Sequence, residues 1–101
     1  MLRITPIETD QVTTLKLEGS LSGPWVDELR RCWTELAEKD VRLEVDLRGL
    51  HFLDSRGTDL LLSMERQGSR LFGSSPFIHD LLHIEVLVRT TRVGKAYGKE
   101  N

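Results

Sequence analysis

The chain has 101 residues, of which 39% are apolar and 30% are charged, and its formal net charge is −2. This length corresponds to one domain, and this apolar content is too high for a disordered chain. The slightly acidic balance argues against a protein that mainly binds nucleic acid, since such proteins carry a strong basic excess. The single cysteine, Cys32, excludes an intramolecular disulfide and a cysteine-rich zinc site.

The distribution of apolar and basic residues predicts where the domain lies and how it ends. No apolar run approaches the roughly 18 residues that a membrane span needs, and Met1 to Asp10 show no signal-peptide pattern. We therefore expect a cytoplasmic domain over residues 1–90, without membrane insertion. Residues 89–101 hold four basic side chains and one acid, a net charge of +3. Residues 91–101 are predicted to form a flexible basic tail, with a basic docking arm as the alternative.

The first part of the chain predicts a β-hairpin followed by a helix. Apolar and polar residues alternate from Leu2 to Pro6 and again over residues 12–19, which indicates two antiparallel strands. Ser22-Gly23-Pro24 is a helix-start signal, because proline at the first helical position loses no hydrogen bond. The apolar stripe that follows predicts a helix ending near Lys39.

The alternation is strictest over residues 41–48, which predicts the next strand. We expect a short loop over 49–54, a helix over 56–67, a short strand over 70–73 and a helix that begins after Ser75. Residues 84–88 are β-branched and apolar, and they predict a last strand, with a continuation of the preceding helix as the alternative.

The predicted strands share one feature that bears on the fold. Each is apolar on one face only, whereas a strand covered by helices on both faces would be apolar throughout. Strands that are joined through helices should be parallel, and the first pair should be antiparallel. The sequence thus predicts an α/β fold with a mixed sheet and helices mainly on one face.

Few side chains suggest catalysis or metal binding. His79 and His83 lie four residues apart on a predicted helix, where surface or capping roles compete with metal binding. Cys32 is expected to be a packing residue rather than a nucleophile. Trp25 and Trp33 share one helix face, which favours core packing over a partner-binding stripe. No glycine-rich phosphate cradle is present, so we expect no cofactor and no metal ion.

The segment from Leu43 to Gly57 stands apart from the rest of the chain. It combines a strand, a tight loop and a serine, Ser55, at the mouth of a helix. The hydroxyl there could cap the helix, or it could accept a phosphoryl group that the positive end of the helix would accommodate. Gly57 would leave room for the backbone of another molecule.

This segment resembles the signature of STAS domains, the family named for sulfate transporters and anti-sigma factor antagonists. The matching elements are Val45-Asp46-Leu47, Gly49, Phe52-Leu53, Asp54-Ser55, Gly57 and Leu60-Leu61-Leu62. Leu17 to Leu21 also resembles the family's second strand and the loop after it, and the similarity covers roughly residues 2 to 83.

The resemblance implies a STAS-like fold and a non-enzymatic protein-interaction domain in bacterial signalling. In the bacterial antagonists of this family, a partner anti-sigma kinase phosphorylates the serine of the Asp-Ser pair, and the phosphate abolishes binding. Carried over, Ser55 is the phosphorylation candidate, and the expected partner is an anti-sigma factor of the serine kinase type. The predicted partner-binding residues are Asp54, Ser55, Arg56, Gly57 and Thr58.

Two further interpretations remain open. The domain could be a STAS-like scaffold or regulatory adaptor that is never phosphorylated, with Ser55 serving only as a helix cap. It could also be a small nucleotide-binding or hydrolytic protein that uses Asp54, Ser55 and His51, which would require His51 within hydrogen-bond reach of the other two. The open sheet face or a sheet edge would also allow a homodimer.

Overall fold

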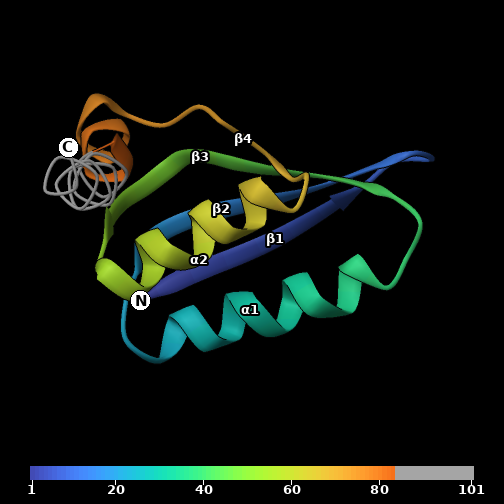
Figure 1. Cartoon of the computed structure of the whole chain (residues 1–101), viewed down its shortest axis with the longest axis horizontal. Helices are drawn as coiled ribbons and strands as arrows, with labels where there is room; N and C mark the ends of the chain where they lie inside the picture. Colours follow the sequence, from blue (N-terminus) through green and yellow to red (C-terminus); the bar gives the residue numbers. More distant parts are fainter. Residues whose placement is uncertain (84–101) are drawn as a thin grey trace, which may run out of the picture.

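A mixed four-stranded sheet in the order β1-β2-β3-β4 organises the chain. The structure is a computed structural model that describes residues 1–83. Its elements are β1 (Leu2–Glu8), β2 (Val12–Leu21), α1 (Pro24–Ala37), β3 (Arg42–Leu53), α2 (Ser55–Arg66) and β4 (Arg70–Phe72) (Figure 1). Residues 76–83 are also helical. The predicted strand at 84–88 and the predicted tail at 91–101 lie outside the described residues.

The pairing of the strands follows from how they are connected. β1 and β2 are antiparallel, from Leu2 opposite Gly19 to Glu8 opposite Thr13. β2 and β3 are parallel and so are β3 and β4, with α1 and α2 as the crossovers. Parallel neighbours need such a crossover because the chain must return to the same end of the sheet. The predicted mixed sheet with an N-terminal antiparallel hairpin is confirmed.

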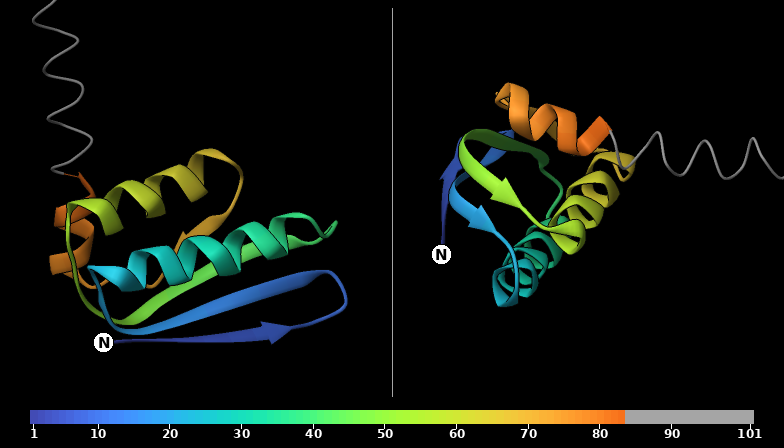
Figure 2. Two further views of the ribbon diagram at one scale, coloured as in Figure 1. Left: turned by 90° about the horizontal axis from the view of Figure 1, so that it is seen from below. Right: turned by 90° about the vertical axis from the view of Figure 1, so that its left-hand side faces the viewer.

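The hydrophobic core lies between the sheet and one layer of helices. Figure 2 shows α1 and α2 side by side on one face of the sheet. The strands bury alternate residues toward them, including Leu15 and Leu17 of β2 and Val45 and Leu47 of β3, each no more than 1% exposed. Ile78, which is fully buried, brings the helix at 76–83 into the same core. The prediction of helices mainly on one face is therefore confirmed.

The opposite face of the sheet is polar. Lys16 and Glu44 are half-buried there, and Arg70 pairs with Glu44 at 3.3 Å. Asp46 is buried on this face because Arg48 folds over it, with Nη2 2.7 Å from Oδ2. The hydrogen bonds from the Arg48 side chain hold the pKa of Asp46 below its usual value, although burial opposes that effect.

The predicted loop at 49–54 is wrong, since β3 continues through Leu53. The pairing of β2 with β3 shifts register twice, between Lys16 and Glu18 and between Gly19 and Ser20. Extra residues in β3 at these bulges interrupt its period of two, so the sequence no longer alternates like a strand. At Gly49 a Cβ atom would lie 2.8 Å from Cγ of Glu18, which is why a glycine occupies this crowded position.

The other differences from the predicted boundaries are small. β2 extends to Leu21, α1 ends at Ala37 instead of near Lys39, and α2 covers Ser55–Arg66. Pro24 is the first residue of α1, as its missing N–H predicted. Among the described residues, none of the helices combines the length and the apolar character that a membrane crossing requires.

Candidate functional site

The predicted site residues lie where two parallel strands end and two helices begin. β2 ends at Leu21 and β3 ends at Leu53, and α1 and α2 start within three residues of these ends. Because the two strands are parallel, both helix N-termini lie at the same end of the sheet (Figure 1). The free N–H groups of both helices therefore face a common region.

Asp54 links the two helix N-termini. Its Oδ1 accepts a hydrogen bond from the backbone N–H of Gly57 at 2.7 Å, and its Oδ2 accepts one from Gly23 at 3.0 Å. Its own N–H donates to the carbonyl of Leu21 at 3.2 Å. Burial raises the pKa of Asp54, but the N–H donors of Gly23 and Gly57, assisted by Arg56, outweigh burial and lower it. Asp54 is thus the cap of α2 and is ionised at neutral pH.

Ser55 is the first residue of α2 and is exposed. Because Asp54 caps the helix, the Ser55 hydroxyl is not needed for that purpose. Within the described part of the chain, this hydroxyl takes part in no hydrogen bond, so the fold leaves it open to another molecule. The sequence left two roles open for this serine, helix cap and phosphate acceptor. In the structure Asp54 is the helix cap.

Arg56 extends from α2 to the first turn of α1. Its Nη2 lies 3.0 Å from Oδ1 of Asp27, which also pairs with Arg30 at 3.2 Å. All three side chains are at least half exposed, so these pairs contribute about 1 kcal/mol or less to stability. The guanidinium therefore lies at the surface between α2 and α1, where an incoming anion can compete with Asp27 for it.

Gly57 and Thr58 are the buried residues of the predicted site. Thr58 is 4% exposed, and its hydroxyl donates to the carbonyl of Asp54 at 3.0 Å. A Cβ atom on Gly57 would lie 2.5 Å from the carbonyl oxygen of Leu21. The space at Gly57 is therefore filled by the chain itself, whereas the sequence had suggested room for the backbone of another molecule.

Phe52 adds an apolar group to this end of the molecule. It is 44% exposed although it lies near the end of a central strand, and its neighbour Leu53 is 3% exposed. The motif that contains Phe52-Leu53 has apolar residues at both positions and does not indicate this difference. The alternation of a strand could have indicated it, since neighbouring side chains point to opposite faces.

The arrangement does not assemble the catalytic group that the third interpretation requires. His51 is exposed, and no hydrogen bond in the described residues joins it to Asp54 or Ser55. Both carboxylate oxygens of Asp54 already accept backbone N–H groups. No group of three or more His, Cys, Asp or Glu side chains in the described residues could hold a metal ion.

The cysteine and the two tryptophans of α1 are partly buried. Burial raises the pKa of the Cys32 thiol, so the nucleophilic thiolate is disfavoured. Trp25 and Trp33 pack against the core, which agrees with the packing interpretation of these two residues.

A family model described as "Mlab, STAS domain" matches residues 4–85. The chain belongs to the STAS domain family. The match covers most of β1, all of β2 and the whole segment around Asp54 and Ser55, so the resemblance drawn from that segment is confirmed. No curated protein matches the chain.

Solved structures share the fold of this STAS domain. An anti-sigma factor antagonist from Mycobacterium paratuberculosis superimposes with a TM-score of 0.73 at 19% identity, over 89% of this chain and 82% of that chain. The anti-sigma factor antagonist SpoIIAA in its unphosphorylated form gives 0.63 at 20% identity, over 91% and 98%. The Bacillus cell fate determinant SpoIIAA in the phosphorylated form gives 0.64 at 20% identity, over 84% and 83%. At these identities the likeness establishes the fold.

Proposed function

We propose that this STAS domain is a non-enzymatic protein-interaction module of bacterial signalling, of the anti-sigma factor antagonist type. Its partner is an anti-sigma factor that is also a serine kinase, and the contact surface is the start of α2 around residues 54–58. Phosphorylation of Ser55 switches the binding off. The proposal places the domain in the cytoplasm, where the ATP that a serine kinase consumes is present.

The observation that carries this proposal is the exposed Ser55 hydroxyl on the first residue of α2. A kinase needs an accessible hydroxyl. The Ser55 hydroxyl is not needed as a helix cap, because Asp54 caps α2. The occurrence of phosphorylation in a protein of the same fold also supports the proposal, since SpoIIAA has been determined in both an unphosphorylated and a phosphorylated form.

The switch would act through charge at the surface. A phosphate on Ser55 adds about two negative charges, which the N-terminal end of α2 and the nearby Arg56 would accommodate. The neighbouring carboxylates of Asp54 and Asp27 would concentrate negative charge at the same place. An interface built around a neutral hydroxyl would therefore lose affinity, while the domain itself would stay folded.

Intact-mass measurement after incubation with ATP and an anti-sigma serine kinase from the same bacterium tests this function. Wild type should gain one phosphate, and Ser55→Ala should gain none. Ser75→Ala is the matched control, because Ser75 also lies at a helix start but its Oγ accepts the N–H of Ile78 at 3.2 Å. This control should be phosphorylated like wild type.

Two other outcomes would count against the phosphorylation switch. Phosphate on Ser55→Ala would assign the modification to another residue. A partner that binds wild type and Ser55→Asp with equal affinity, without phosphorylation of either, would favour the unphosphorylated scaffold.

A further inference from the structure

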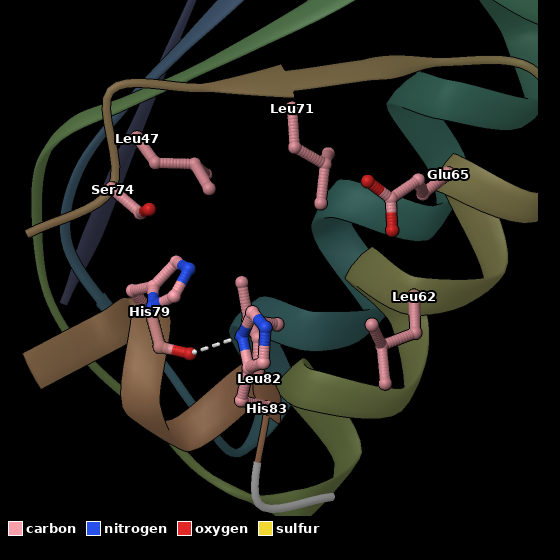
Figure 3. Close-up of a pocket in the computed structure, with 8 residues that line it drawn as sticks. All are labelled: Leu47, Leu62, Glu65, Leu71, Ser74, His79, Leu82 and His83. Atoms are coloured by element: carbon pink, nitrogen blue, oxygen red, sulfur yellow. Dashed lines mark hydrogen bonds between the residues drawn. The ribbon is translucent and has the colours of Figure 1, made fainter. Parts of the chain in front are cut away.

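A cavity of about 350 Å³ lies on the other side of α2 from α1, and the proposed function does not use it. It is an open cavity bordered by β3, β4, α2 and the helix at 76–83, and no residue of 54–58 lines it (Figure 3). Leu47, Leu62 and Leu71 form its apolar part. Cavities that hold small molecules in proteins measure about 300–1,000 Å³ and combine apolar walls with a few polar groups.

The polar groups of this cavity lie on two sides of the apolar part. Glu65 extends from α2 on one side, and Ser74 and His79 lie across the cavity from it (Figure 3). Within the described residues, the Glu65 carboxylate has neither an ion-pair partner nor a hydrogen bond. Among residues 1–83, Glu65 therefore places one unpaired negative charge beside the apolar part of the cavity.

His83 adds a second imidazole ring to the wall of the cavity, with its centroid 4.1 Å from that of His79. Its Nδ1 lies 3.2 Å from the backbone carbonyl oxygen of His79 (Figure 3). Because a carbonyl oxygen only accepts, Nδ1 is the donor in this contact. The polar groups of the cavity thus come from three segments: α2, the loop after β4 and the helix at 76–83.

The lining of the cavity selects among ligand classes. A metal ion would need a compact group of ligands, and the described residues contain no group of three or more His, Cys, Asp or Glu side chains that could hold one. An organic anion would be repelled by the Glu65 carboxylate. An ammonium group would pair with that carboxylate through a charge-assisted hydrogen bond, and a hydrocarbon chain attached to it would fit the apolar part.

We propose that this cavity binds a small organic cation, a primary amine carried on a short alkyl chain or a single aromatic ring. The ammonium group would pair with Glu65, and the hydrocarbon part would lie against Leu47, Leu62 and Leu71. None of residues 54–58 lines the cavity, so this site is separate from the surface of the proposed switch.

Titration of the isotope-labelled full chain with 2-phenylethylamine, followed by two-dimensional NMR, tests the proposal. The amine should shift the amide signals of Leu47, Leu62 and Leu71. Glu65→Gln should weaken binding about tenfold, the effect of one charged hydrogen bond. Because Glu65 is exposed, this variant keeps the fold.

Two comparisons make the test specific. Glu35→Gln is the matched control variant, because Glu35 borders another cavity, between β1 and α1, and its loss should leave amine binding unchanged. The uncharged 2-phenylethanol and the anionic 3-phenylpropionate should bind at least tenfold more weakly than the amine. The proposal would be overturned by the absence of shifts at these leucines, by equal binding of the propionate, or by unchanged affinity in Glu65→Gln.

Discussion

Two adjacent residues, Asp54 and Ser55, have different roles at the start of α2. Asp54 accepts the N–H groups of Gly23 and Gly57, and so its side chain holds α1 and α2 together. Ser55, the next residue, is exposed and has no hydrogen bond from its hydroxyl in the described residues. Asp54 therefore stabilises this end of the molecule, whereas Ser55 is available to a partner.

Replacement of Asp54 tests the structural half of this division. Asp54→Ala leaves two backbone N–H groups without their acceptor, so we expect a loss of about 2–3 kcal/mol in the free energy of unfolding, measured in urea. Ser55→Ala should change this free energy by less than about 0.5 kcal/mol, as other surface substitutions do. Equal losses in the two variants would contradict the division.

The sequence predicted part of this site and missed part of it. The Asp54-Ser55 pair could be placed at a helix start because capping residues precede helices in a local pattern. The bond from Gly23 to Asp54 and the pair of Arg56 with Asp27 join residues 31 and 29 positions apart, and no local pattern encodes such contacts. Only the packing of α1 beside α2 creates them.

At the scale of the elements, α2 lies close to the end of β2. The space is so narrow that a Cβ atom on Gly57 would meet the Leu21 carbonyl at 2.5 Å. Helix propensity favours alanine over glycine at this position. Packing against Leu21 favours glycine, because it leaves no room for a methyl group.

The stability of the Gly57→Ala variant shows whether packing outweighs helix propensity. We expect a loss of about 1–3 kcal/mol, because the added methyl group pushes α2 away from β2. The control is Ser63→Ala, a half-buried position of the same helix, where alanine should be neutral or stabilising. Thermal unfolding followed by circular dichroism measures both, and a Gly57→Ala variant as stable as wild type would refute the close contact.

The strands show the same limit of prediction. Residues 41–48 alternate strictly, so their strand could be predicted from the sequence. The rest of β3, through Leu53, could not, because its bulges opposite β2 break the alternation that reveals a strand. The strand is held there by pairing with residues far away in the chain.

At the scale of the whole molecule, two carboxylates connect stability to pH. The hydrogen bonds from Arg48 lower the pKa of Asp46, and backbone N–H donors outweigh burial to lower that of Asp54. In the unfolded chain both carboxyl groups have a pKa of about 3.9. Their contribution to stability is therefore complete above that pH and is lost as the pH falls through the lower pKa values of the folded state.

Thermal unfolding measured between neutral pH and pH 3 checks this linkage. The midpoint temperature should stay nearly constant down to about pH 5 and then fall. Asp54→Asn, which cannot ionise, should start from a lower midpoint and fall less steeply. A variant that loses stability as steeply as wild type would assign the acid sensitivity to other groups.

Charge on the Ser55 oxygen, at the exposed start of α2, is proposed to control partner binding. The most direct measurement is the dissociation constant of the anti-sigma kinase for the unmodified domain and for the domain phosphorylated on Ser55. We expect the phosphate to weaken binding by at least about a hundredfold, equivalent to about 3 kcal/mol, while the unfolding temperature stays within a few degrees. Equal affinity of the two forms would contradict the account.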